Sequence, residues 1–168
     1  MTSKACTIIQ KYTYIQDMTS VHASGLNCRW EVRYKDYVGK TWDILLSNSK
    51  VTLPIKRGEH LLWLEWGRRP DEDLQGFTVG GMVREESLQA GKWKQFMPQK
   101  VHLHLSEFSE PGVIVPTLFF DVPENYAVLG IVATWHGEKR VYIVTTQPPR
   151  GMVWHKDGWP VIVPTASA

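Results

Sequence analysis

Two ionisable side chains in the second half of the chain have the types and settings of acid–base groups. His155 lies between two β-branched runs, directly after Trp154 and four residues before Trp159. An imidazole titrates near neutral pH, so it can accept or release a proton there. Glu110 lies where a strand pattern meets a Pro-Gly pair, and a desolvated carboxylate at a strand end can act as an acid or base. A structural histidine and an exposed loop acid are the alternatives.

Thiols and two further histidines are the other candidate groups. Cys6 and Cys28 are the two cysteines of the chain and show no CxxC pattern, which indicates free thiols in place of a disulfide framework or a zinc site. His102 and His104 share one face of a strand, but no third ligand accompanies them, so we expect no metal. The sequence has no GxGxxG, GxxxxGK or GxSxG motif, and we expect no cofactor.

Basic and aromatic residues occur together at two places. The run WGRRP places Arg68 and Arg69 after Trp66, and the run MVREE places Arg84 after an apolar pair. Guanidinium groups at strand ends can contact phosphates. The chain has eight tryptophans, and an indole is both a common core residue and a good stacking surface for a base. The alternatives are a solvated turn for the arginines and core positions for most of the tryptophans.

The overall composition is typical of a globular protein with one domain. The 168 residues are 43% hydrophobic and 21% charged, with a formal net charge of +2. That charge is too small to establish nucleic-acid binding, and a mixed solvated surface is the alternative. The sequence has no 18-residue apolar stretch and no signal-peptide core. We therefore expect a cytoplasmic protein without a membrane partner, associated with the nucleoid when it binds DNA.

Short β-like runs dominate the chain and predict an α+β fold with a mixed or antiparallel sheet. Gly and Pro turn signals separate these runs. We expect a single domain over residues 1–168, with 1–26 and 165–168 weakly defined, and short helices at 84–97, from Pro70 and at 148–154. The predicted strands are 28–34, 41–46, 51–56, 60–66, 76–83, 100–105, 112–122, 126–135 and 140–146, with a further apolar run at 160–163.

Five pieces of the sequence occur in the order of a known family's motifs. They are VTLPIK (51–56), WGRRP (66–70), MVREE (82–86), VHLHLSEFSE (101–110), and the C-terminal set VLGIVATW, VYIVTTQPP and WHKDGWPVIVP. Together they resemble the SRAP family, the SOS response-associated or abasic-site-processing proteins that crosslink to damaged single-stranded DNA. The similarity covers residues 45–164 and implies an SRAP-like sheet.

The resemblance also implies roles for particular residues. Glu110 and His155 fall on the family's active-site glutamate and histidine, which manage protons while an N-terminal cysteine attacks the opened sugar. Here position two is Thr2, so Cys6 is the near-terminal thiol and would need cleavage of the preceding chain to free its amine. Met82 stands in place of the family's asparagine. Covalent crosslinking is therefore expected to be degraded or absent, and whether the chain is an enzyme stays open.

Three hypotheses about function remain open. The first is an SRAP-like protein that binds single-stranded or abasic DNA, with contacts from Arg84, Arg68, Arg69, Trp66, Trp154 and Trp159. The second is a non-catalytic protein-interaction or inhibitory module on the same fold, of the kind a mobile element carries, with a protein partner. The third is a plain globular interaction protein whose tryptophans are core or interface residues.

Overall fold

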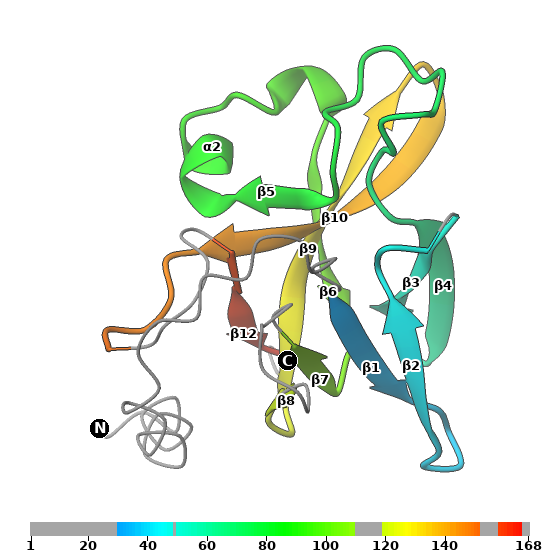
Figure 1. The fold of residues 1–168 in the computed structure, drawn as a ribbon, viewed down its shortest axis with the longest axis vertical. Coiled ribbons are helices and arrows are strands. Elements are labelled where there is room, and N and C mark those ends of the chain that lie inside the picture. The colour runs from blue at the N-terminus through cyan, green and yellow to red at the C-terminus, as the bar shows by residue number, and fades with distance from the viewer. Residues whose placement is uncertain (1–29, 49, 110–118, 152–157, 166–168) are drawn as a thin grey trace, which may run out of the picture.

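The computed structural model describes residues 30–48, 50–109, 119–151 and 158–165, which form one β-rich domain with very few helices. A small antiparallel sheet has the strand order β2-β1-β7-β8. Hydrogen bonds join β1 on one edge to β2 and on the other to β7 (Figure 1). The bounds of these strands are Glu31–Lys35 for β1, Thr41–Leu45 for β2, Glu107–Ser109 for β7 and Phe119–Asp121 for β8.

A larger sheet has the order β11-β10-β9-β6-β3-β4, with β12 added beside β9 and β5 running parallel to β10. A bridge between Trp66, just after β4, and Val141 of β10 brings the two sides of this sheet together in the manner of a barrel. The bounds are Thr52–Arg57 for β3, His60–Glu65 for β4, Met82–Arg84 for β5, Gln99–Leu103 for β6, Tyr126–Trp135 for β9, Glu138–Thr146 for β10, Trp159–Pro160 for β11 and Ile162–Pro164 for β12.

The strands β9 and β10 are the centre of the fold because both of their faces are buried. Side chains of one face, including Val132 and Val141, pack into a core with β3, β6 and the small sheet. Those of the other face, including Ile131 and Tyr142, pack against the segment 74–96. Burial on both sides explains why the two strands appear in the sequence as nearly continuous apolar runs.

The helical segment is shorter than the sequence predicts. In place of one helix over 84–97, α2 covers Glu85–Gln89 and a 3-10 turn, η2, covers Lys94–Phe96. Gly91 has φ 74, and the backbone N–H groups of Gly91 and Lys92 bond to the carbonyls of Leu88 and Ser87. This pattern is a Schellman motif, which ends a helix at a glycine in the left-handed conformation.

Two further predictions about local structure need correction. The helix expected from Pro70 is not formed, because the stretch after Trp66 is a loop fixed by an antiparallel bridge between Arg68 and Gly80. The strand expected at 76–83 shrinks to β5, Met82–Arg84. Residues 148–151 are not helical, and the rest of the helix expected there lies outside the described residues. Within the described part of the chain, no helix is long and apolar enough to cross a membrane.

Candidate functional site

Four of the predicted catalytic and DNA-binding residues lie outside the described residues: Cys6, Glu110, Trp154 and His155. Cys28 lies outside them as well. The proposed acid–base pair of Glu110 and His155 therefore stays a prediction. Two described residues that lie close in sequence to Glu110 and His155 are in contact: the rings of Phe108 and Trp159 lie 5.2 Å apart, edge to face. Both chain segments that lead to the predicted pair are thus anchored in one aromatic cluster.

Trp159 lies in the core, in contrast to its predicted role as a DNA contact. Its side chain is only 8% exposed and packs edge to face against Phe108 and Phe120. Stacking on a base needs an open ring face. We therefore regard Trp159 as a core residue in this conformation.

The loop 66–81 holds the two arginines of the WGRRP run. Arg68 donates to the carbonyl of Phe77 at 2.9 Å, and Arg69 donates to the carbonyls of Leu46, at 2.6 Å, and Asn48. The Arg69 guanidinium also lies 5.2 Å over the ring of Trp66. Both guanidinium groups thus satisfy backbone acceptors and fix the loop, so a phosphate at either arginine would have to compete with these bonds.

Trp66 is partly buried, and its ring packs against Gly81 at the end of the same loop. A Cβ on Gly81 would come 1.9 Å from its ring, so only glycine leaves room for the indole. The indole Nε1 is buried and has no hydrogen-bond partner within the described chain. Trp66 therefore packs the loop against β10 and offers little open ring surface to a ligand.

A buried arginine that the sequence analysis did not single out completes this structural network. Arg140 lies 2.7 Å from Glu65, 3.2 Å from Glu72 and 3.3 Å from Glu138. Burial by itself raises the pKa of Glu72, but the hydrogen bond from the Arg69 backbone and the charge of Arg140 together lower it below its ordinary value. The network joins β4, the loop and β10 at the place where the sheet closes.

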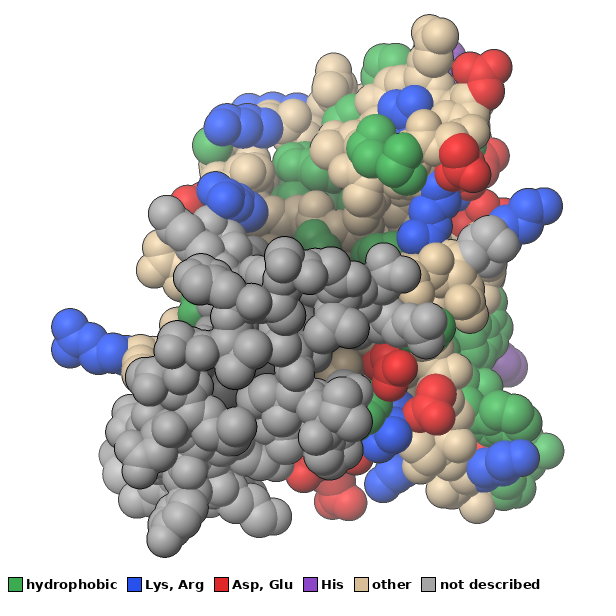
Figure 2. Space-filling view, in the orientation of Figure 1, with side chains coloured by type: hydrophobic (Ala, Val, Ile, Leu, Met, Phe, Trp, Pro, Cys, Tyr) green, Lys and Arg blue, Asp and Glu red, His purple; other side chains and the backbone are tan. Residues whose placement is uncertain are grey.

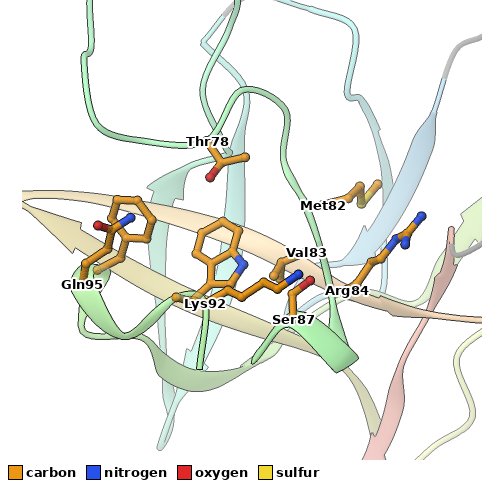
Figure 3. A pocket seen from close by; sticks show the side chains of 9 residues that line it. Thr78, Met82, Val83, Arg84, Ser87, Lys92 and Gln95 are labelled. Atoms are coloured by element: carbon orange, nitrogen blue, oxygen red, sulfur yellow. The ribbon is translucent and has the colours of Figure 1, made fainter. Parts of the chain in front are cut away.

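A cavity of about 330 Å³ is lined by one of the predicted site residues, Arg84. Figure 3 shows Lys92 running toward Ser87, with Thr78 across the cavity and the Arg84 guanidinium pointing outward. The elements β5, α2 and η2 and the loop 66–81 position its walls. The lining residues are Thr78, Met82, Val83, Arg84, Ser87, Lys92, Trp93, Gln95 and Phe96.

Charge and aromatic character meet in this cavity. Arg84 and Lys92 are exposed cations, and Ser87 and Gln95 add hydrogen-bonding groups. Trp93 and Phe96 form a buried aromatic wall, with ring centroids 5.3 Å apart. Figure 2 shows Lys and Arg side chains gathered at the α2 end of the molecule. The arrangement can hold an anionic ligand with an apolar part.

Of the residues that line the cavity, Arg84 was predicted from the sequence, whereas Lys92, Trp93 and Gln95 were not. The feature of the sequence that could have indicated them is the Lys-Trp-Lys run at 92–94, in which basic residues flank an aromatic one. Among the described residues, no group of three or more His, Cys, Asp or Glu side chains is placed to hold a metal ion. No family model, no curated protein and no solved structure matches this chain.

Proposed function

We propose that this protein binds single-stranded DNA and that the cavity beside Arg84 and Lys92 receives part of the strand. The observation that supports the proposal is that two exposed cations, Arg84 and Lys92, line one cavity of about 330 Å³. Proteins that bind single strands have a positively charged groove that follows the backbone.

The contacts of the arginines within the WGRRP run make that run a poorer phosphate-binding site than this cavity. Arg68, Arg69 and Arg140 donate to backbone carbonyls or carboxylates within the fold. Arg84 and Lys92 line the cavity, and both residues are exposed. A phosphate can approach these two side chains without breaking the contacts that hold the loop 66–81.

The SRAP resemblance adds a finer proposal, action at abasic sites. Glu110 follows Ser109, the last residue of β7, and His155 precedes Trp159 of β11 by four residues. The ring contact of 5.2 Å between Phe108 and Trp159 supports a meeting of these two chain segments. We propose that Glu110 and His155 act there on an opened sugar.

A titration with fluorescein-labelled oligothymidylate tests DNA binding. We expect Arg84→Ala combined with Lys92→Ala to weaken binding by about tenfold or more and to reduce the salt slope by about 1.4, because each phosphate contact on a single strand contributes about 0.7. Lys139→Ala, an exposed cation of the β9–β10 hairpin, is the matched control. Unchanged affinity and salt slope in the double variant would refute this site.

An abasic oligonucleotide separates binding from chemistry. Intact mass after incubation should show the protein unmodified if only binding survives, and a DNA adduct if Cys6 or another nucleophile reacts. Loss of an adduct in Glu110→Gln or His155→Gln, with unchanged affinity for an undamaged strand, would assign the chemistry to those residues.

A further inference from the structure

Large exposed hydrophobic side chains gather on two neighbouring hairpins. Six of the eight in the described part of the chain lie on them: Tyr37, Val38, Trp42, Leu61, Leu62 and Trp63. Tyr34 joins the hairpins, because it lies opposite Trp42 in the β1–β2 pair and its ring is 5.0 Å from that of Trp63. We call Tyr34, Trp42, Leu61 and Trp63 the hairpin patch. Clustered exposure of this kind marks an interaction surface.

The outer edge of β4 offers backbone groups as well as side chains. The turn Gly58-Glu59 joins Arg57 to His60, and Gly58 has φ 61, as a two-residue hairpin turn requires. His60 and Leu62 therefore bond to β3, and the N–H and C=O groups of Leu61 and Trp63 point to the other edge. No backbone bond to those two residues from outside β3 is found among the described residues.

This edge lacks the usual protection against pairing. Exposed edge strands normally carry lysine, proline or a bulge, which prevents another chain from adding to them. The strand β4 reads His-Leu-Leu-Trp-Leu-Glu, and its first four residues are exposed. Its partner β3 carries the only proline of the hairpin, Pro54, which faces β6 because its carbonyl accepts from the His104 N–H. At Leu61 and Trp63 the outer edge of β4 is thus open to a further strand, whereas Trp66, just after its last residue, bridges to Val141 of β10.

The rim of the hairpin patch is positive. Lys35, Lys40, Lys56 and Arg57 are exposed around it, and the Lys40 ammonium lies 3.9 Å over the Trp42 ring. Of the nearby acids, Asp36 accepts from the Trp42 indole and two backbone N–H groups, and Asp43 pairs with Arg33. Glu65, at the end of β4, pairs with Arg140, and Glu59 is exposed in the turn between β3 and β4. A second copy of this chain would bring like charges together, whereas an acidic partner would complement them.

We infer that β4 is a docking edge for an extended, acidic segment of a partner protein, which adds to the sheet as a further strand. Backbone bonds to Leu61 and Trp63 supply register, and alternate apolar side chains of the segment cover the hairpin patch. The residues of the segment that alternate with these side chains lie on the opposite face, which Arg57 shares because it pairs with His60, so an acid there faces a cation. This inference does not depend on DNA binding at the cavity.

Amide hydrogen exchange of the full-length protein tests the inference. The probe is a synthetic peptide with the order Glu-Val-Glu-Ile-Glu-Tyr-Glu, and the control peptide has the same composition in scrambled order. We expect saturable binding of the first peptide and exchange slowed by about tenfold or more at the Leu61 and Trp63 amides. The amide of Leu62 should change little, because it already bonds to β3.

Two variants locate the contact. Leu61→Lys and Arg57→Glu should each weaken peptide binding by about tenfold, whereas Val79→Lys, an exposed hydrophobic position outside the patch, should leave it unchanged. Absence of binding at millimolar peptide would overturn the inference. Equal binding of the scrambled peptide would also overturn it. The same holds for a concentration-dependent dimer that protects the same amides, and for protection of the Leu61 and Trp63 amides by residues 1–29 in the free monomer. Displacement of the peptide by oligothymidylate would also overturn it, because the edge would then be a DNA surface.

Discussion

Replacing Arg140 with methionine tests how the loop 66–81 is held on the sheet. Arg140 is 5% exposed, and its guanidinium contacts Glu65, Glu72 and Glu138 within 3.3 Å. Methionine keeps much of the apolar stem and removes the charge. Three carboxylates then lose the cation that they share, and the closure between Trp66 and Val141 loses its main polar contact.

The expected loss of stability lies between the value for a fully buried ion pair and the value for a solvent-exposed one. Removing one partner of a fully buried ion pair costs about 3–5 kcal/mol. Here the three carboxylate side chains are 24%, 42% and 50% exposed, so water replaces part of the lost solvation. We expect Arg140→Met to lower the free energy of unfolding by about 2–3 kcal/mol at neutral pH. Glu138→Gln, which removes the most exposed partner, should cost less than about 1 kcal/mol.

The loss should also depend on pH. The pKa of Glu72 is lowered from its ordinary 4.5 in the folded protein, against the opposing effect of burial, by the Arg69 backbone and by Arg140. A carboxyl group of this kind stabilises the fold above its unfolded pKa, and the contribution is lost as the pH falls through the folded value. The stability difference between the wild type and Arg140→Met should therefore be greatest at neutral pH and shrink as the pH falls below 4.5.

Urea unfolding followed by tryptophan fluorescence measures both effects. The wild type, Arg140→Met and Glu138→Gln are compared at neutral pH and in acid. Each variant must have the same m-value as the wild type, because only then does a shift of the urea midpoint measure a change in stability. A loss in Arg140→Met no greater than that in Glu138→Gln would refute the shared-cation argument. A loss that stays constant across the acid range would show that Glu72 is not the carboxylate that Arg140 stabilises.

Two further substitutions test the loop and the core. Gly67→Ala should lower the free energy of unfolding by about 2–4 kcal/mol, because Gly67 has φ 57 and a Cβ there would lie 2.2 Å from the Gly80 carbonyl oxygen. The control is Gly58→Ala, which should cost only about 1 kcal/mol, because Gly58 has φ 61 but open space around it. Thermal unfolding measures both variants. Trp159→Ala should cost about 3–5 kcal/mol through loss of its packing on Phe108 and Phe120, measured by chemical unfolding. A large loss of DNA affinity in this variant without loss of stability would instead restore Trp159 as a base contact.

Most strands could be predicted from the sequence because their burial patterns are regular. The run 126–135 is observed as β9 with the same bounds, since both faces of that strand are buried and its apolar residues form one block. The strand β7 was missed because it has three residues, Glu107–Ser109, too few for any periodicity. It pairs with β1, and in this pairing Ser109 lies opposite Glu31, 78 positions earlier in the chain. Only tertiary contacts set this pairing.

The candidate site was less predictable because it depends on where one helix ends. In a continuous helix over 84–97, Arg84 and Lys92 would lie about 12 Å apart along the axis. Instead α2 ends at Gln89, and the left-handed conformation of Gly91 turns the chain back, so that both cations line one cavity. The sequence contains the glycine and both basic residues, but only the folded chain shows that they act together.

The loop 66–81 connects the predicted arginines to the cavity in an indirect way. The Tyr142 hydroxyl, whose pKa burial raises to about 12, donates to the Thr78 carbonyl at 3.0 Å, and Arg68 donates to the neighbouring Phe77 carbonyl. Thr78 in turn lines the cavity. A hydroxyl with so high a pKa stays protonated throughout the neutral range and remains a donor there. Arg68 therefore supports one wall of the site from within the loop, and Arg69 ties the same loop to the carbonyls of Leu46 and Asn48.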